Sequence, residues 1–486
     1  MTSVTTIEQF EQQIAAAQAA YELGRNASPQ QRGTWLRAVA AALTANADEL
    51  IAIAQKETHL DQARLQGELK RTAFQLELLA DEINYGLHFE VAIDHADATW
   101  GMGPRPDIRR MNVALGVVGV FGASNFPFAF SVIGGDSASA LAAGCSVVHK
   151  VHDGHLTLGL RTGEIVVDAL KQAGAPEGLF SVVVGRAAAE ALVDHPLVQA
   201  IGFTGSTAGG RALFDRANHR PQPIPFYGEL GSINPVFVTE KAWATRRDDI
   251  LTGYATAATM GMGQFCTKPG LLFIPKFDRA EIETVLEQTF STKQFAPLLT
   301  PNLRKGFDAA LAQVSALANI EVLIASDQAE ALSPTVLVTN VQAVKENPGV
   351  LELEMFGPAT VIVEYESQAQ LSEIIALLEG QLTCTLQAEA DEQLGDLVDA
   401  LHAKCGRLLW NGWPTGVTVS YAQHHGGPYP STTSSAKTSV GTGAIGRFMR
   451  AVAYQTFPDA ALPPALQENN PWNIVRRVDG RIIDAQ

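Results

Sequence analysis

Short apolar runs and amphipathic helical stretches alternate along the chain after about residue 113. Continuous apolar runs of strand length are typical of strands buried on both faces of a parallel sheet, whereas apolar positions three and four apart are typical of helices. The pattern predicts strands at residues 113–121, 146–150, 180–184 and 198–204, and helices at 137–143, 157–172, 187–193 and 206–214. This repetition predicts an α/β fold with a doubly wound parallel sheet.

Helical patterns precede this region, and a second α/β pattern follows it. Before about residue 90 the chain has a helical pattern, in which Ser28, Pro29 and Gln31 predict a capped helix over residues 29–56. From about residue 224 to 421, short apolar runs again alternate with helical stretches, including 279–289 and 371–378. We therefore expect a second α/β domain there.

Three further segments lack a helical pattern. Residues 99–110 are polar and contain Pro104 and Pro106, which disfavour a helix and favour a hairpin or an edge strand. Residues 426–446 are rich in Gly, Pro, Ser and Thr and predict a loop. Residues 473–483 predict a charged terminal strand.

One uncharged stretch, between Arg110 and Asp136, is long enough to span a bilayer. Several glycines interrupt it, and Asn125-Phe126-Pro127 lies at its centre, where a helix exposed to lipid would be broken. We interpret it as a buried strand, a polar loop and the start of a helix, and not as a membrane segment.

Composition and charge narrow the possible functions. The 486 residues are 46% hydrophobic and 18% charged, which is too apolar for a disordered chain, and the length suggests two or three domains. The net charge of -16 repels nucleic acid and anionic membranes, so neither is an expected partner. An anionic cofactor would have to bind through local cations and helix N-termini.

The cysteines indicate a reducing environment. The four cysteines are widely separated along the chain, at Cys145, Cys266, Cys384 and Cys405. Because this is not the spacing of a metal site, we expect no metal. The N-terminus lacks the pattern of a signal peptide. We expect a cytoplasmic protein with free thiols.

Two glycine-rich strings are candidate phosphate sites. Residues 441–446 spell GxGxxG but follow a Ser/Thr-rich segment near the end of the chain, whereas a dinucleotide fingerprint follows a strand and opens a βαβ unit. Gly205 and Ser206 are the better candidate, because an apolar run passes there into a predicted helix whose free N–H groups suit a pyrophosphate. An ordinary capped helix remains the alternative.

Lys150 and Asp153 follow the predicted strand 146–150, at the edge where α/β sheets bind ligands. A cation and a carboxylate at this position suit a ribose diol. The alternative is a solvated strand end.

Cys266 and Glu229 are candidate reactive groups. Cys266 stands in a glycine-flanked turn beside Lys268, a cation that would lower the pKa of a nucleophilic thiol. Glu229 lies between apolar residues and glycine, where partial desolvation would raise its pKa and suit a general base. Each could instead be structural.

Taken in order, these segments resemble the aldehyde dehydrogenase superfamily over nearly the whole chain. The motifs that carry the resemblance are Ser-Asn125-Phe-Pro, Lys150, Gly-Phe-Thr-Gly205-Ser206, Glu229-Leu-Gly231, Gly-Gln264-x-Cys266 and Glu354-Met-Phe356-Gly-Pro358. The resemblance implies two doubly wound α/β domains and a small β element for oligomerisation.

Within the superfamily, the chain resembles the α-ketoglutaric semialdehyde dehydrogenase branch, on the strings at 121–131, 264–270, 425–430 and 438–442. That branch oxidises 2,5-dioxopentanoate to 2-oxoglutarate. Two alternatives stay open: a broad aliphatic or fatty aldehyde dehydrogenase, and a catalytically silent homologue with a binding role. The first would differ in whether its substrate tunnel carries a cation, and His424 and His425 lie in a loop that could reach that tunnel.

The resemblance implies three catalytic residues. Cys266 would attack the aldehyde carbon, and the Asn125 amide with the Cys266 N–H would hold the oxyanion of the thiohemiacetal. Glu229 would activate the water that hydrolyses the thioester, which argues against the coenzyme-A-acylating relatives. The product would be a free acid.

The resemblance also implies a cofactor, NAD or NADP. Lys150 would bind the adenine-side ribose, Gly205 and Ser206 the pyrophosphate, and Glu354 the nicotinamide ribose, with Phe356 nearby. Asp153 would accept hydrogen bonds from the ribose and repel a 2′-phosphate, so we expect NAD to be preferred, with NADP possible.

Two departures from the family pattern are visible. Ser232 and Ile233 replace the common Gly-Lys after the glutamate motif, and Ser124 stands where a tryptophan commonly precedes the asparagine. Neither change removes a catalytic group.

The family fold implies a domain plan. Residues 1–98 and 113–224, with a return segment at 422–455, would form the NAD(P)-binding domain, and 225–421 the catalytic domain. A hairpin at 99–112 and a tail at 456–486 would serve oligomerisation, as a homodimer or homotetramer.

Overall fold

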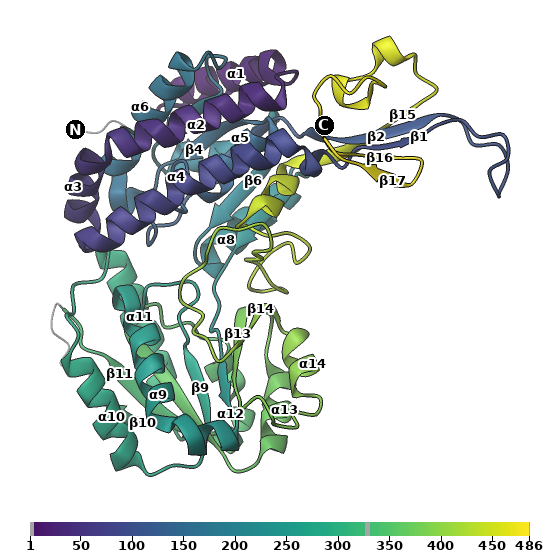
Figure 1. Cartoon of the computed structure of the whole chain (residues 1–486). Coiled ribbons are helices and arrows are strands. Elements are labelled where there is room, and N and C mark those ends of the chain that lie inside the picture. Colours follow the sequence, from purple (N-terminus) through teal and green to yellow (C-terminus); the bar gives the residue numbers. More distant parts are fainter. Residues whose placement is uncertain (1–3, 326–330, 486) are drawn as a thin grey trace.

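The architecture is built on three β-sheets. The structure, a computed structural model, describes residues 4–325 and 331–485. Within these residues the sheets have five, seven and five strands (Figure 1). The outermost residues of the predicted segments 1–98 and 456–486 lie outside this range.

The first sheet consists of parallel strands in the order β5-β4-β3-β6-β7. Its strands are β3 (Val117–Phe121), β4 (Ser146–Lys150), β5 (Phe180–Val183), β6 (Val198–Thr204) and β7 (Phe226–Glu229). The helices between them are α5 (Gly135–Ala143), α6 (Leu156–Gln172), α7 (Arg186–Asp194) and α8 (Thr207–Asn218). The predicted doubly wound α/β pattern is confirmed, and the uncharged stretch is a strand, a loop and a helix start.

One predicted strand was wrong in its extent. The apolar run 113–121 is divided between β2 (Ile108–Ala114) and β3, which belong to different sheets. Gly116, with a φ of 134°, lies between the two strands. Only glycine adopts such a φ readily, so the chain changes direction there although the apolar pattern continues.

Four helices precede the first sheet: α1 (Ile7–Gly24), α2 (Pro29–Ala45), α3 (Ala47–Thr58) and α4 (Gln62–Tyr85). The Ser28 hydroxyl accepts from Gln31 N, and the Gln31 side chain accepts from Ser28 N, which completes the predicted capping box. The predicted helix 29–56 is two helices, because Asn46 leaves the helical conformation (φ -104°, ψ 18°). Apolar side chains of α2–α4 pack with those of α5 and α6 in one core.

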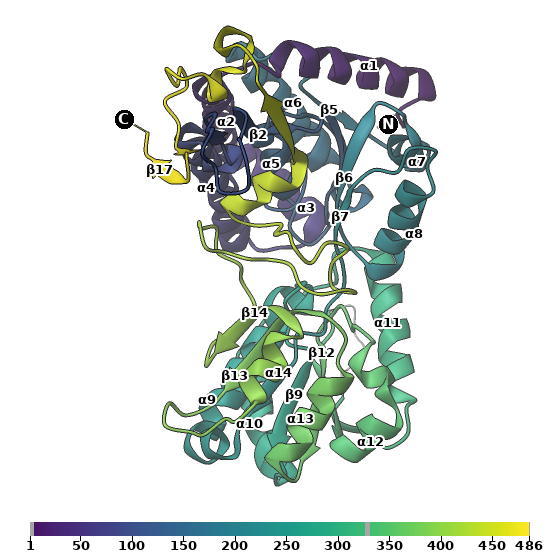
Figure 2. The ribbon, with the colours of Figure 1, turned by 90° about the vertical axis from the view of Figure 1, so that its right-hand side faces the viewer.

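The second sheet has the strand order β10-β11-β12-β9-β8-β13-β14, with β10 antiparallel to β11. Its strands are β8 (Val236–Val238), β9 (Leu271–Pro275), β10 (Glu321–Ile324), β11 (Thr335–Asn340), β12 (Ala359–Tyr365), β13 (Gln381–Gln387) and β14 (Cys405–Trp410). The flanking helices are α9 (Glu240–Thr259), α10 (Arg279–Ser291), α11 (Pro301–Ser315), α12 (Val341–Glu346), α13 (Gln368–Leu377) and α14 (Leu397–His402). Figure 2 shows this unit below the first one. The predicted second α/β region is therefore confirmed.

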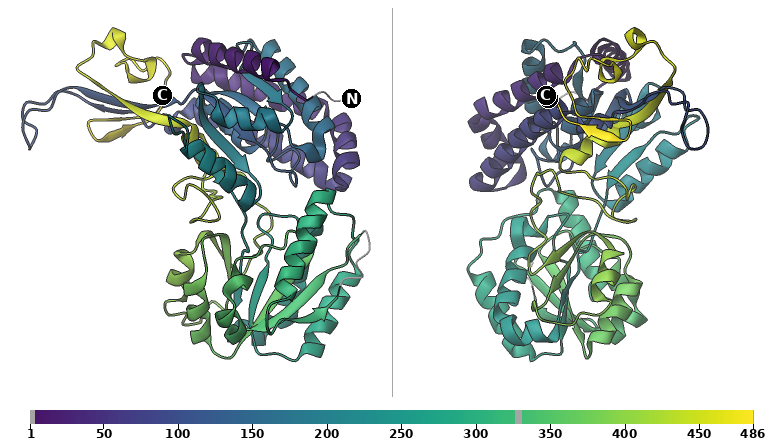
Figure 3. Two further views of the ribbon diagram at one scale, coloured as in Figure 1. Left: turned by 180° about the vertical axis from the view of Figure 1, so that it is seen from behind. Right: turned by 45° about the vertical axis from the view of Figure 1, so that its right-hand side comes forward.

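The third sheet, in the order β15-β2-β1-β16-β17, forms an arm. It joins β1 (Ala92–Asp94) and β2 to the C-terminal strands β15 (Met449–Gln455), β16 (Arg476–Val478) and β17 (Arg481–Ile483). The hairpin between β1 and β2 extends beyond the helices, as seen from behind in Figure 3. The predicted hairpin at 99–110 is therefore the tip and one side of a longer one.

Residues beyond β14 return from the second unit to the first. They pass between the two units without long helices and end in the short 3-10 helix η5 (Thr442–Phe448), which leads into β15 (Figure 2). The GxGxxG string lies at η5 and follows no strand, so it lacks the context of a dinucleotide fingerprint. No helix in the described ranges is both long and apolar enough to cross a membrane.

Candidate active site

The candidate site lies at the carboxyl edge of the first sheet. The chain builds this sheet outward from β3 through β4 to β5 and then returns to place β6 on the other side of β3. The loops after β3 and β6 therefore flank a topological switch point, where open α/β sheets bind ligands. Asn125 follows β3, Ser206 follows β6 and Glu229 ends β7, so the fold brings three predicted site residues to one edge.

Asn125 is buried in the loop after β3, and its Nδ2 donates to the Gln264 carbonyl at 2.9 Å. Helix α4 holds this loop. The Glu68 carboxylate accepts from the backbone N–H groups of Phe128 and Ala129, at 2.8 and 3.0 Å. From the same helix, Arg64 donates to the Asn125 carbonyl at 2.7 Å.

Cys266 lies in a turn between the 3-10 helix η3 (Met260–Gly263) and β9. Asn234, a residue that the sequence did not single out, fixes the backbone of this turn. Its Nδ2 donates to the carbonyls of Cys266 and Lys268, at 2.8 and 3.0 Å. The side chain of Asn234 is fully buried, so the position of Cys266 is set by a rigid neighbour.

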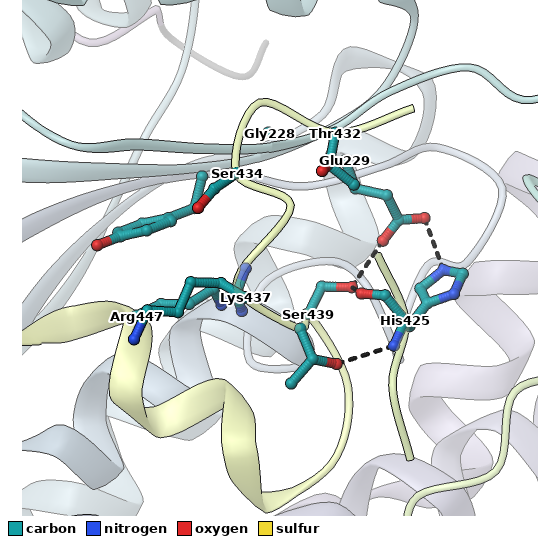
Figure 4. Close-up of a pocket in the computed structure, with 10 residues that line it drawn as sticks. Gly228, Glu229, His425, Thr432, Ser434, Lys437, Ser439 and Arg447 are labelled. Carbon is teal, nitrogen blue, oxygen red and sulfur yellow. Dashed lines mark hydrogen bonds and ion pairs between the residues drawn. The ribbon is translucent and has the colours of Figure 1, made fainter. Parts of the chain in front are cut away.

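Glu229 is buried at the end of β7, between two hydrogen-bonding side chains. His425 Nε2 lies 2.8 Å from Oε1, and the Ser439 hydroxyl donates to Oε2 at 2.8 Å (Figure 4). Burial raises the pKa of the Glu229 carboxyl, but the charge and hydrogen bond of His425 and the hydrogen bond from Ser439 outweigh it. The pKa is held below its ordinary value.

The predicted raised pKa of Glu229 was therefore wrong. The apolar neighbours of Glu229 in the sequence do desolvate the carboxyl. The two groups that lower its pKa, His425 and Ser439, approach from about 200 positions later in the chain and leave no local pattern beside Glu229.

His425 connects the glutamate to the cysteine. Its Nε2 is also 3.7 Å from Cys266 Sγ. One carboxylate oxygen of Glu229, the Cys266 sulfur and one ring nitrogen of His425 all lie within 4.8 Å of one another. The sequence placed His424 and His425 in a loop that could contact substrate. The structure instead buries His425 against the reactive groups.

The surroundings of the Cys266 thiol differ from those predicted. Burial, and then the nearby Glu229 carboxylate, raise the pKa of the Cys266 thiol well above its ordinary value. Lys268, the cation expected to lower this pKa, is buried and points elsewhere. Its Nζ donates to the carbonyls of Met355, Gly357 and Ala359. A thiol with a raised pKa would need a neighbouring base to take its proton before it could act as a nucleophile.

Lys268 instead fixes the segment that carries Glu354 and Phe356. Burial raises the pKa of Glu354 and lowers that of Lys268, and the attraction between the two groups opposes both shifts. Glu354 lies against Gly231, where an added Cβ would be 2.6 Å from Oε2. Phe356 is half-buried beside it in the chain.

The predicted cofactor residues line the same edge of the sheet. Lys150 Nζ forms an ion pair with Asp153 Oδ1 at 3.0 Å, and Asp153 is largely exposed. Ser206 caps α8 by accepting from Gly209 N at 3.3 Å, and Gly205 N donates to the Glu229 carbonyl at 3.1 Å. A capped helix start, a strand-end lysine and a nearby carboxylate fit an anionic dinucleotide.

A cavity of about 440 Å³ adjoins Cys266, within the usual range for small-molecule sites. The sequence did not show which side chains line it. The lining includes three phenylalanines and one arginine: Arg71, Phe126, Phe130, Phe265, Cys266, Thr267, Gly416, Val417 and Thr418.

A cysteine beside a buried carboxylate, together with a capped helix start at the switch point of a parallel sheet, is typical of a cofactor-dependent enzyme site on two stacked α/β units. The family model described as "Aldehyde dehydrogenase family" matches residues 2–445. The chain belongs to the aldehyde dehydrogenase family, whose members use NAD(P) to oxidise aldehydes.

Two similar proteins carry a more specific name. Alpha-ketoglutaric semialdehyde dehydrogenase 2 of Azospirillum brasilense is 44% identical over 96% of this chain and 92% of its own length. Alpha-ketoglutaric semialdehyde dehydrogenase of Acinetobacter baylyi is 39% identical over 98% of this chain and 92% of its own.

A solved structure confirms the fold class. Aldehyde dehydrogenase 21 of Physcomitrella patens superposes with a TM-score of 0.77 at 18% identity, covering 94% of this chain and 92% of that one. At this identity the likeness concerns the fold alone.

Proposed function

We propose that this chain oxidises 2,5-dioxopentanoate (α-ketoglutaric semialdehyde) to 2-oxoglutarate, with Cys266 as nucleophile. The observation that carries the chemistry is the cluster of Cys266, Glu229 and His425, in which the sulfur, one carboxylate oxygen and one ring nitrogen lie within 4.8 Å of one another. The names of the two relatives, at 44% and 39% identity, support the substrate.

In the first step, Cys266 Sγ attacks the aldehyde carbon and forms a C–S bond. Its proton passes to the Glu229 carboxylate, which His425 and Ser439 hold in place. The developing oxyanion is stabilised by the Asn125 amide and the Cys266 N–H. In the structure Asn125 Nδ2 donates to the Gln264 carbonyl, which keeps that amide beside the cysteine turn.

Glu229 then releases to solvent the proton that it took from Cys266. In the last step, the carboxylate takes a proton from water, and the resulting hydroxide attacks the thioester carbon. The C–S bond breaks, and the free acid leaves Cys266 as a thiolate. A cavity of about 20 Å³ on the side of Glu229 lined by His425, Thr438 and Ser439 is large enough for one water molecule, although Cys266 does not line it (Figure 4). Bound NAD(P) would supply the two-electron acceptor that is needed between these two steps.

The cofactor would lie along the carboxyl edge of the first sheet. Lys150 would hold the adenine-side ribose, Gly205 and Ser206 the pyrophosphate, and Glu354 the nicotinamide ribose, with Phe356 packing nearby. Glycine at 205 suits this role, because an added Cβ would be 2.8 Å from the Phe203 ring and would displace the turn. Lys268 keeps the Glu354 segment in place through its three backbone carbonyls.

We propose that NAD is preferred over NADP. Asp153 is exposed beside Lys150, where a carboxylate accepts hydrogen bonds from ribose hydroxyls and repels a 2′-phosphate. Comparing kcat/KM for the two cofactors tests this. We expect Asp153→Asn to reduce the difference in kcat/KM between NAD and NADP. Equal kcat/KM for the two cofactors in the unmodified enzyme would contradict the proposed preference.

The three sheets would serve separate roles. Residues 1–98, 113–224 and 422–455 would bind the cofactor, and 225–421 would carry the cysteine. The arm, from 99–112 and 456–486, would join subunits in a homodimer or homotetramer. All four cysteines are free thiols, which supports a cytoplasmic location.

One experiment tests the proposed reaction. Reduced-nicotinamide formation is measured with 2,5-dioxopentanoate and with pentanal, and Cys266→Ala serves as the control. We expect strong preference for the charged aldehyde and no turnover in the variant. Phenylalanine rings in the cavity wall favour an uncharged aldehyde, so equal rates would instead support a broad aliphatic or fatty aldehyde dehydrogenase. Cofactor binding without turnover of either aldehyde would support a silent homologue.

A further inference from the structure

The cavity beside Cys266 contains one cationic side chain whose terminal nitrogen atoms are unused. Arg71, on α4, donates through Nε to the Val417 carbonyl at 3.1 Å. Its Nη1 and Nη2 are buried and have no hydrogen-bond partner among residues 4–325 and 331–485. Burying guanidinium donors without partners is costly, so such a group is well suited to bind an anion.

Two other arginines near this cavity are engaged. Arg64 donates to the Asn125 carbonyl. Arg407 donates through Nη1 and Nη2 to the carbonyls of Gly416 and Pro414, at 3.1 and 2.6 Å. Arg71 thus differs from its neighbours in having both terminal nitrogens available.

The nearest carboxylate on α4 does not satisfy Arg71. Glu68 directs Oε1 to the backbone of Phe128 and Ala129, and its Oε2 lies 4.0 Å from Arg64. In the described ranges, no carboxylate lies within 4.0 Å of the Arg71 nitrogens. The charge of Arg71 is therefore only partly balanced by the protein.

We infer that Arg71 binds the distal carboxylate of the aldehyde substrate, through Nη1 and Nη2, while Cys266 attacks the other end. Both side chains line one cavity, and the planar guanidinium matches a carboxylate in a two-point hydrogen bond. The rings of Phe130 and Phe265 would pack along the carbon chain between them. This inference rests on the proposed function, because it identifies the residue that selects a carboxylate-bearing aldehyde.

The test is a kinetic comparison of Arg71→Met on two substrates. Methionine keeps an unbranched apolar side chain and removes the charge. For 2,5-dioxopentanoate we expect kcat/KM to fall by about 100-fold, mainly through KM, as for loss of one partner of a buried charge pair. For pentanal we expect a change of less than about threefold, and Arg71→Lys should retain part of the preference.

Arg64→Met is the matched control. Arg64 lies two turns earlier on α4 and contacts the Asn125 carbonyl, so its loss should slow both substrates alike. A second measurement avoids turnover: in Cys266→Ala, glutarate binding by calorimetry should weaken on adding Arg71→Met.

The outcomes separate the two proposals. Equal losses with both aldehydes, or unchanged glutarate binding, would show that Arg71 is structural and overturn the inference. The inference would also be overturned if the Arg71→Met variant preferred the charged aldehyde by the same factor as the unmodified enzyme. An unmodified enzyme without any preference would contradict the proposed substrate itself, and the inference would fail with it.

Discussion

At the scale of single residues, the central feature is the pair of hydrogen bonds on Glu229. Both carboxylate oxygens are occupied, by His425 at 2.8 Å and by Ser439 at 2.8 Å. A buried carboxylate held in this way stays ionised at neutral pH and keeps a fixed orientation. Both properties suit a group that takes protons from the Cys266 thiol and from water.

We expect His425→Ala to shift the acid limb of the kcat–pH profile to higher pH. Burial raises the pKa of Glu229, and His425 lowers it. Without His425 the pKa rises, so the carboxyl stays protonated, and inactive as a base, up to a higher pH. Ser439→Ala removes one hydrogen bond and should cause a smaller shift in the same direction. An unchanged acid limb in both variants would show that Glu229 does not limit this step.

At the scale of elements, the turn between η3 and β9 determines where Cys266 lies. Gly263 has a φ of 65°, and a Cβ at this position would lie 2.2 Å from the Gly357 carbonyl oxygen. That carbonyl also accepts from Lys268, so the turn, the lysine and the Glu354 segment form one packed unit. A change in the turn would move both the nucleophile and the expected ribose ligand.

Gly263→Ala should therefore lower kcat/KM for every aldehyde by at least about tenfold and destabilise the protein by about 2 kcal/mol, the usual scale of backbone strain. Steady-state kinetics and thermal unfolding measure the two effects. Gly306→Ala on α11 is the control, since an added Cβ there meets nothing within 4 Å. Normal activity in Gly263→Ala would mean that the turn accommodates the methyl group.

At the scale of the whole molecule, the returning segment 422–448 links the site to the fold. It carries His425 and Ser439 to Glu229, and a few residues later it carries Arg447 to Asp136 on α5. The Arg447 Nη2 to Asp136 Oδ1 distance is 2.5 Å, and both side chains are buried. One contact between distant parts of the chain therefore anchors the segment that completes the active site.

Arg447→Met should destabilise the protein by about 3–5 kcal/mol, because it leaves a buried carboxylate without its partner. Burial raises the pKa of Asp136, and loss of Arg447 would raise it further. The loss of stability caused by Arg447→Met should therefore become smaller as pH falls and Asp136 becomes protonated. Thermal unfolding across pH measures this. Adding Asp136→Asn should recover part of the loss, and an equal deficit at all pH values would contradict this account.

The arm leads to a prediction about assembly. Its edge strand β17 exposes Ile482 and Ile483, at 58% and 45%, and the hairpin tip exposes Met102. An exposed apolar strand edge is a pairing surface. We expect light scattering to show a dimer or tetramer, and Ile482→Asp to shift it toward monomer. Val322→Asp, on the edge strand of the second sheet and also 58% exposed, should not. A monomeric unmodified protein would refute the proposed role of the arm.

Local patterns in the sequence determined the strands of the first sheet and the turns that carry two of the candidate site residues. Strands β4 and β6 begin and end where the apolar runs do, because buried parallel strands require continuous apolar side chains. The turn of Cys266 and the helix start at Ser206 were visible for the same reason: glycine and capping residues act within a few positions.

The tertiary structure alone decided the surroundings of the reactive groups. His425 reaches Glu229 across 196 positions, and Lys268 turns away from Cys266, the residue it nearly adjoins in sequence. The partnerless nitrogens of Arg71 became visible only when the cavity wall was assembled. Hydrogen bonds and charges act over a few ångströms in space, and a single sequence carries no local pattern that tells which distant side chains the packed fold will bring within that distance.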